Sequence, residues 1–424
     1  MRGKGCGFIR FRPRGNGNMP ERVVNKNITD VRGIRARGAH IGIKSKRRDL
    51  AIIVSDVPAS AAAVYTKNRV VAEPIKLTRR HLKNGIAQAI LVASGNANAC
   101  TGPDGMKAAE ESVRALAQEL NIPEDHVIFA ATGVIGVPFP TQKVVDGVRK
   151  NVKYLNSRNI SGVMAANAIM TTDTFQKEGY TSFTLGGREI NMAGIAKGAG
   201  MIHPNMGTML SFIVCDADID PGLLDEALKY SVERSFNMIS VDGDTSTNDM
   251  VTVMSNGMAK NPRITEKNND YYKFRKNLDY LCQYLAKAIV SDGEGATKFI
   301  EYRVVNARTE DEARRVVRTV SDSNLVKTAI FGRDPNWGRI LAAVGRSGVE
   351  IDPDKVDIYV GSKKYVQVAQ KGAYHPFNRT QLKQMLRSSR VRILVDLHQG
   401  GSEATGWGTD FSYEYVRINA EYTS

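Results

Sequence analysis

Apolar residues occur along the chain in short runs that predict β-strands. The runs are rich in β-branched residues, and most end near Gly, Asp, Asn or Ser, as strands commonly do. The segments that meet this description are 50–55, 86–94, 126–132, 208–217, 299–306, 356–361 and 391–397. We expect them to form the sheets of the fold.

Between these runs, apolar residues recur at three- and four-residue spacing, which predicts amphipathic helices. Helices are expected over 105–120, from a cap at Thr141 to Val152, and over 221–237, 271–290 and 309–320. Thr309 and Glu312 are spaced as a capping box before the last helix. The mixed order of strands and helices predicts α/β or α+β layers and excludes an all-helical bundle or an all-β sandwich.

Composition supports an ordinary globular protein. The 424 residues are 42% hydrophobic and 24% charged, which excludes wholesale disorder and predicts two or three domains with a substantial core. No apolar run reaches the roughly 18 residues of a membrane span. The four cysteines are far apart and no H-E-x-x-H motif occurs. We therefore expect no disulfide scaffold, no metal and no resident cofactor.

The positive charge is concentrated at the N-terminus. The first fifty residues hold 14 basic and 3 acidic side chains, a surplus of 11 within a net charge of +15. Residues 1–18 are rich in Gly and Arg and lack the apolar core of a secretory signal. We interpret them as a disordered basic leader rather than as a contact for nucleic acid or membrane, with Met19 as an alternative start.

Glycine and small polar residues gather in five loops between apolar segments. These loops are 95–105, 131–136, 197–208, 242–249 and 332–339. Such loops allow backbone N–H groups to approach a ligand or a reacting oxygen, although any one of them is more often a tight turn. Five in one chain favour an active site. None carries the P-loop motif.

Two of these loops, when each is considered alone, indicate a structural role rather than a functional one. The segment 242–249 resembles the start of a calcium-binding EF-hand loop but lacks its Gly and Glu positions, so Asp242, Asp244 and Asp249 are expected to brace a turn. Thr208 follows a Gly-rich segment at the start of an apolar strand, where a threonine is usually only a β-former.

Longer strings of residues change that interpretation. They are IVSDVPASAAAVYTKNRV, SGNANACTG, AATGVIG, AIMTTDT, KGAGMIHPNMGTML, SVDGDTSTND, SDGEGATK and GRDPNWGRILAAVGRSG. Together these strings resemble the ornithine acetyltransferase family, the glutamate N-acetyltransferases of the cyclic arginine pathway. The resemblance covers about residues 30–424.

The resemblance implies a chain that cleaves itself before a threonine. The matching residue is Thr208, so an α chain of 19–207 and a β chain of 208–424 are expected, assembled as an α2β2 heterotetramer. The family usually has Ala where this chain has Gly207. The implied fold is a sandwich of two β-sheets between helical layers with a smaller α/β domain, as in the related DmpA aminopeptidases.

The implied reaction moves an acetyl group from N-acetylornithine to glutamate through an acetyl ester on Thr208. Cleavage would free an α-amino group with a reference pKa of about 7.7–8, which can act as the base for the hydroxyl. Thr132 and Gly133 match the family's oxyanion hole, formed by a hydroxyl and a backbone N–H. Because the α-amino group fills the role of the base, His203 is assigned to structure.

Residues that hold the substrate also follow from the resemblance. Lys197 is expected to pair with the substrate carboxylate and Glu294 with its ammonium groups. The full set of implied substrate-binding residues is Thr171, Lys197, Thr208, Glu294, Asn419 and Ser424.

Several alternatives remain open. The enzyme could also use acetyl-CoA as a co-substrate, which would make it bifunctional, or it could be a monofunctional ornithine acetyltransferase. A hydrolase of the same architecture is a second hypothesis, although the related β-aminopeptidases use a serine at the cleaved position. A non-enzymatic binding protein with residues 1–18 as its contact surface is a third. We expect a cytoplasmic enzyme whose activity does not need these eighteen residues.

Overall fold

The larger sheet of the protein carries three of the residues singled out above, Thr132 and Gly133 on β4 and Lys197 on β6. The computed structural model describes residues 25–203 and 209–421. Within these ranges the larger sheet has eight strands in the order β4–β3–β2–β9–β7–β6–β5, with β1 paired to β2. The strands are β1 (Ile34–Ala39), β2 (Leu50–Tyr65), β3 (Ile86–Asn96), β4 (Val127–Val134), β5 (Lys177–Leu185), β6 (Arg188–Lys197), β7 (Leu210–Cys215) and β9 (Met250–Ser255).

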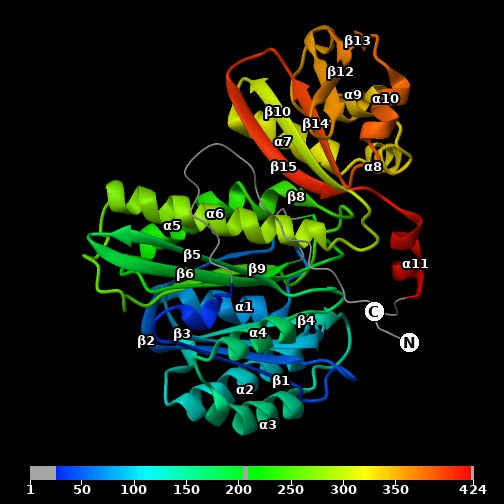
Figure 1. Cartoon of the computed structure of the whole chain (residues 1–424). Helices are drawn as coiled ribbons and strands as arrows, with labels where there is room; N and C mark the ends of the chain where they lie inside the picture. The colour runs from blue at the N-terminus through cyan, green and yellow to red at the C-terminus, as the bar shows by residue number, and fades with distance from the viewer. Residues whose placement is uncertain (1–24, 204–208, 422–424) are drawn as a thin grey trace, which may run out of the picture.

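A register shift in β2 divides this sheet into two layers. Residues 50–54 of β2 pair with β1 and β3, whereas residues 60–65 pair with β9. One buried cluster contains residues of both layers, among them Ile90 of β3 and Phe212 of β7. The sheet is therefore a sandwich whose two layers share one long strand. Residues of α4 (Asn159–Ala168) belong to the same cluster, and α1 (Glu73–His81) lies along the edge of β4, where the hydroxyl of Thr78 accepts from the backbone N–H of Phe129 (Figure 1).

Helices cover the two outer faces of the sandwich (Figure 1). On one side, α2 (Gly102–Leu120) and α3 (Thr141–Asn151) bury Val113 and Val144 against Phe129 of β4. On the other side lie α5 (Pro221–Glu233) and α6 (Asn269–Ser291), whose apolar stripes join a second buried cluster. The expected order of helix, sheet, sheet and helix layers is confirmed.

A smaller α/β unit follows in the C-terminal part of the chain (Figure 1). In the described residues its sheet has seven strands in the order β13–β12–β11–β14–β10–β15–β8. The strands are β8 (Ile239–Ser240), β10 (Phe299–Ala307), β11 (Asp357–Gly361), β12 (Tyr365–Gln370), β13 (Ala373–Tyr374), β14 (Arg390–Asp396) and β15 (Ser402–Thr409). The accompanying helices are α7 (Glu310–Ser321), α8 (Asn324–Phe331), α9 (Trp337–Gly345), α10 (Arg379–Met385) and α11 (Tyr413–Glu421).

The apolar patterns predicted the positions of the strands and helices well, but the helix caps were predicted less well. Each predicted strand and helix overlaps an observed one, although β7 begins at Leu210, and Thr208 lies outside the described residues. Thr141 is the first residue of α3 and not its cap, since Pro140 occupies the cap position. Thr309 does cap α7 by accepting from the backbone N–H of Glu312. The carboxylate of Glu312 pairs with Arg308, so only one half of the expected capping box is made.

Among the helices of the described ranges, none is both long enough and apolar enough to cross a membrane.

Strand β4 carries a glycine that the packing requires. Gly133 has a φ of +135°, and a Cβ at this position would lie 2.3 Å from the backbone carbon of Gly95 on β3. We expect Gly133→Ala to lower the free energy of unfolding by about 3 kcal/mol or more, because strain and a backbone clash combine. Denaturant titration measures this change.

Gly136 provides the matched control for this substitution. It also has a positive φ, +79°, but a Cβ there would meet nothing within 4 Å. Gly136→Ala should therefore show only the conformational cost, about 1–2 kcal/mol. Equal losses for the two variants would contradict the proposed close approach of β3 and β4.

Candidate active site

Four of the five Gly-rich loops meet at one place. Gly95 and Gly133 are register partners on β3 and β4. The side-chain amide of Asn248 donates to the carbonyl oxygens of Ala97 at 2.6 Å and Ala131 at 2.9 Å. This buried amide therefore ties the loops 95–105, 131–136 and 242–249 together.

Asp242 joins the fourth loop to these three. Its carboxylate accepts from the backbone N–H groups of Met201 at 2.5 Å and Ile202 at 2.7 Å. Burial raises the pKa of Asp242 to about 6. The expectation that this aspartate braces a turn is confirmed, and the braced segment directly precedes residues 204–208.

The fifth loop, 332–339, lies elsewhere. It connects α8 to α9 in the smaller α/β unit, where Asp334 is 3.4 Å from the guanidinium of Arg379. Trp337, Tyr374 and Phe377 line a shallow pocket beside it. The sequence grouped this loop with the other four, but its described contacts belong to the smaller unit.

Lys197 and Thr132 form the centre of the site. Lys197 is the last residue of β6, in one layer of the sandwich, and Thr132 lies near the end of β4, in the other. The ammonium Nζ of Lys197 is 3.2 Å from the hydroxyl Oγ1 of Thr132, and both residues are buried. Burial lowers the pKa of Lys197. A cation and a hydroxyl donor thus face one buried point, with Gly133 adjacent in the chain.

Glu294 lies against the segment that follows Lys197. Its backbone N–H donates to the carbonyl oxygen of Ala199 at 2.9 Å. A Cβ on Gly200 would be only 2.3 Å from Oε2 of Glu294, so the missing side chain leaves room for the carboxylate. The side-chain amide of Asn419, on α11, donates to that same oxygen at 3.0 Å.

Thr171 reaches the same region through its loop. Its backbone N–H donates to Asp173 at 2.9 Å, and its carbonyl oxygen accepts from Arg47. Burial opposes ionisation of Asp173, but the charges of Lys177 and Lys197 hold its pKa below the usual value. The structure therefore brings together the described members of the predicted set, namely Thr132, Gly133, Thr171, Lys197, Glu294 and Asn419.

The remaining predicted residues, Gly207, Thr208 and Ser424, lie outside the described residues. The residues that follow Thr208 lie beside the end of β6. Leu210 is the register partner of Lys197, and the carbonyl oxygen of the buried Met209 accepts from Met250 at 3.2 Å.

His203 has contacts that fit the structural role assigned to it. Its carbonyl oxygen accepts from the hydroxyl of Thr245 at 3.1 Å, and its Nδ1 is 3.6 Å from the carboxylate of Asp322. Burial lowers its pKa. The assignment of His203 to structure stays a prediction.

Two charged residues of this region were not singled out as site residues. Lys44 donates from Nζ to the carbonyl oxygen of Met170 at 2.8 Å, and burial lowers its pKa to about 8. Asp249 is almost completely buried near the charge of Lys197, and burial raises its pKa well above the usual value. Lys44 lies in a basic stretch that indicated no site, and Asp249 lies in the loop 242–249, where it was expected to brace a turn.

Metal binding was not expected. Within residues 25–203 and 209–421, no group of three or more His, Cys, Asp or Glu side chains is arranged to hold a metal ion.

Known proteins match this chain over nearly its whole length. The family model described as the ArgJ family matches residues 35–424. The arginine biosynthesis bifunctional protein ArgJ of Caldanaerobacter subterraneus is 50% identical over 94% of this chain and 99% of its own. Its counterpart in Symbiobacterium thermophilum is 47% identical over 93% and 98%.

Two solved structures also match. The crystal structure of ArgJ from Bacillus halodurans is 45% identical, covering 51% of this chain and 100% of that chain, with a TM-score of 0.49. The structure of ornithine acetyltransferase complexed with ornithine from Mycobacterium tuberculosis is 31% identical over 44% and 98%, with a TM-score of 0.39.

The extent of the family match and the identity of the relatives decide the assignment. The chain belongs to the ArgJ family of arginine biosynthesis proteins.

Proposed function

We propose that this protein transfers an acetyl group from N-acetylornithine to glutamate through an acetyl ester on Thr208, and that acetyl-CoA is a second acetyl donor. The observation that carries the proposal is the buried contact between Lys197 and Thr132, beside the strand that begins two residues after Thr208. The relatives named as bifunctional proteins of arginine biosynthesis support two activities, and the ornithine in the Mycobacterium tuberculosis structure supports the substrate class.

Cleavage of the bond between Gly207 and Thr208 supplies the base. At neutral pH roughly a tenth of an α-amino group with a pKa of about 8 is neutral, against well under a hundredth of an ordinary lysine. The new amine can therefore take the proton of the Thr208 hydroxyl as that oxygen attacks the acetyl carbonyl. Ornithine leaves, and the amine of glutamate then accepts the acetyl group.

Both half-reactions pass through a tetrahedral oxyanion, which needs hydrogen-bond donors. The hydroxyl of Thr132 and the backbone N–H of Gly133 would supply them. The ammonium of Lys197, 3.2 Å from the Thr132 hydroxyl, keeps positive charge next to that point.

The charges of the substrates fit the charged residues of the site. N-acetylornithine carries a carboxylate and a side-chain ammonium, and glutamate carries an amine and two carboxylates. Lys197 would pair with a carboxylate and Glu294 with an ammonium group, while Asn419 holds Glu294 in place. Thr171, Asn419 and Ser424 complete the proposed substrate contacts. No metal or resident cofactor takes part in this mechanism.

We extend the proposal to the assembly and the compartment. The two chains, 19–207 and 208–424, would remain together as an α2β2 heterotetramer in the cytoplasm, where glutamate and acetyl-CoA are available. Neither nucleic acid nor membrane is a proposed partner.

Thr208→Ala tests the proposed reaction directly. The purified wild-type protein should give two bands of similar size on a denaturing gel, and it should form N-acetylglutamate from glutamate with either N-acetylornithine or acetyl-CoA. Thr208→Ala should give one full-length band and no product, because it lacks the hydroxyl that attacks in both events. A wild-type chain that stays intact yet forms product would overturn the mechanism, and product from N-acetylornithine alone would limit the enzyme to one donor.

Thr132→Ala tests the oxyanion hole. Loss of one donor typically costs about 3 kcal/mol of transition-state stabilisation, so kcat should fall roughly a hundredfold. Thr132→Ser keeps a hydroxyl and should retain most of the activity. An unchanged kcat in the alanine variant, measured on fully cleaved protein, would remove Thr132 from the oxyanion hole.

Gly200→Ala tests the role of Glu294 without changing its charge. The added methyl group would displace the flexible end of the Glu294 side chain, so the variant should fold normally but bind N-acetylornithine about tenfold more weakly. Gly345→Ala is the matched control, since a Cβ there meets nothing within 4 Å. Equal affinities for the two variants would argue against an ammonium partner at Glu294.

A further inference from the structure

A completely buried ionic cluster lies beside the site. Lys177, the first residue of β5, places its Nζ 2.6 Å from a carboxylate oxygen of Asp173 and 2.6 Å from one of Asp292. The side chains of Lys177 and Asp173 are 0% exposed, and that of Asp292 is 3% exposed. The ammonium thus joins the loop before β5 to the turn after α6.

Asp173 holds two segments that carry proposed substrate contacts. One oxygen, Oδ1, accepts from the backbone N–H of Gly198 at 2.7 Å, next to Lys197. The other, Oδ2, accepts from the backbone N–H of Thr171 at 2.9 Å. The same carboxylate therefore sets the position of the Thr171 backbone relative to the end of β6.

Asp292 adds the third segment. It accepts from the backbone N–H of Thr174 at 3.0 Å and also from the hydroxyl of that residue. Asp292 precedes Glu294 by two residues, and the backbone N–H of Glu294 bonds to Ala199, which follows Gly198. The contacts close a ring that contains the loop of Thr171, the end of β6 and the turn of Glu294.

Lys197 adds a positive charge beside the cluster. The cluster holds two carboxylates and one ammonium, and Lys197 brings the second positive charge close to Asp173. Buried ion pairs seldom stabilise a protein more than apolar residues of similar size would. Stability alone is therefore a poor explanation for four charges at this place.

We propose that Asp173, Lys177 and Asp292 are positioning residues that hold Thr171, Lys197 and Glu294 at the spacing required to bind the amino-acid substrates. The inference rests on the proposed function, because it assigns the cluster to the substrate contacts of that site. Thr132 and Gly133, which would stabilise the oxyanion, receive no direct hydrogen bond from the cluster among the contacts of the described residues, and the cluster reaches Thr132 only through Lys197. Its disruption should therefore weaken binding more than it slows the chemical step.

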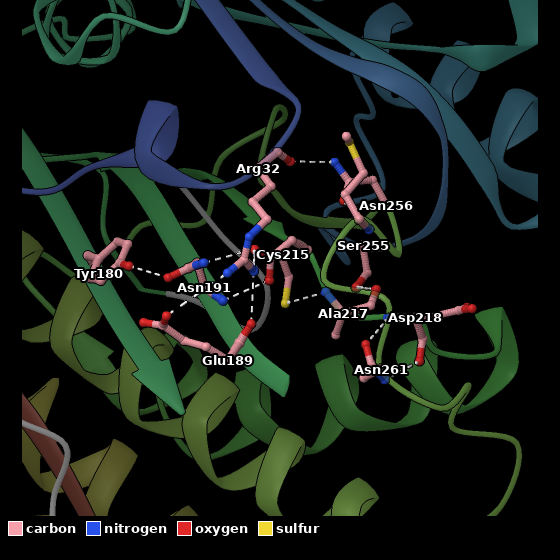
Figure 2. A network of polar contacts seen from close by, with 12 residues as sticks. Arg32, Tyr180, Glu189, Asn191, Cys215, Ala217, Asp218, Ser255, Asn256 and Asn261 are labelled. Carbon is pink, nitrogen blue, oxygen red and sulfur yellow. Dashed lines mark hydrogen bonds and ion pairs between the residues drawn. The ribbon is translucent and has the colours of Figure 1, made fainter. Parts of the chain in front are cut away.

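The far end of β6 offers a matched control. Asp216 is also fully buried, and it accepts from the backbone N–H and the side-chain amide of Asn191 and from the guanidinium of Arg32. Figure 2 shows two of these partners, Arg32 and Asn191. Asn191 precedes Lys197 by six residues of one strand, a separation of about 20 Å at the rise of an extended chain.

The experiment compares Asp173→Asn with Asp216→Asn in the fully cleaved enzyme. Calorimetry gives the affinity for ornithine, steady-state kinetics give KM and kcat for N-acetylornithine and glutamate, and denaturant titration gives the stability of each variant. We expect Asp173→Asn to weaken ornithine binding and raise both KM values by about tenfold or more, with kcat within a few-fold of wild type. Asp216→Asn should leave affinity and KM within about twofold of wild type even at a comparable loss of stability.

Thr174→Val keeps the test decisive if Asp173→Asn does not fold. It deletes only the hydroxyl that donates to Asp292 and should raise both KM values by a few-fold. Asp292→Asn should raise both KM values further. Lys177→Arg, which keeps the positive charge, should retain more affinity for ornithine than Lys177→Met.

Two outcomes would overturn the proposal. One is unchanged affinity in Asp173→Asn or, if that variant does not fold, in Thr174→Val. The other is an equal loss of affinity in Asp216→Asn. Failure of the proposed function would look different, because the wild-type enzyme itself would then form no N-acetylglutamate in the same assay.

Discussion

The contact between the ammonium of Lys197 and the hydroxyl of Thr132 is the interaction on which the site depends. Lys197 ends a strand in one layer of the sandwich and Thr132 lies near the end of a strand in the other, so the contact requires both layers to meet at one edge. The shared strand β2 makes this possible, because its register shift lets one chain segment pair in both layers. The chemistry proposed for Thr208 needs this meeting point, since the nucleophile alone cannot stabilise an oxyanion.

Burial shifts the pKa values of these charged groups, and it also determines the free energy needed to remove them from water. An ammonium removed from water is expensive unless carboxylates lie nearby, and Asp173 provides that charge for Lys197. The carboxylate is in turn fixed by two backbone N–H groups and by Lys177. A site held in this way has little freedom to rearrange, which suits a reaction in which two different amino acids must be bound at the same charged groups in turn.

The sequence predicted individual strands and helices because they depend on local pattern, whereas the sandwich of sheets between helical layers was implied by the resemblance to a family. Strands β3, β4 and β7 are short apolar runs, and α2 and α6 carry apolar stripes at helical spacing, so each could be found without its partners. Strand β15, with the sequence SEATGWGT, has few β-branched residues and was not predicted. It became a strand because β10 pairs with it along most of its length.

The residues of the site also fall into two groups. Some could be found from local sequence, and others only from contacts between distant segments. The Gly-rich loops and the resemblance to a family indicated Thr132, Gly133, Thr171, Lys197 and Glu294. Lys177 and Asp292 gave no signal, since they are 115 residues apart and each looks like an ordinary charged residue in its own segment. The loop 332–339 has the same local composition as the other four loops, but its described contacts lie in the smaller unit, so its part in the site stays a prediction.

The central claim is that the acetyl group rests on Thr208 between the two half-reactions. Mass spectrometry of the cleaved enzyme, mixed with N-acetylornithine in the absence of glutamate and then digested, tests it most directly. The account predicts one acetyl group on the peptide that begins at Thr208, and its loss when glutamate is added before digestion. An acetyl group on another residue, or none on this peptide while N-acetylglutamate still forms at the full rate, would contradict it.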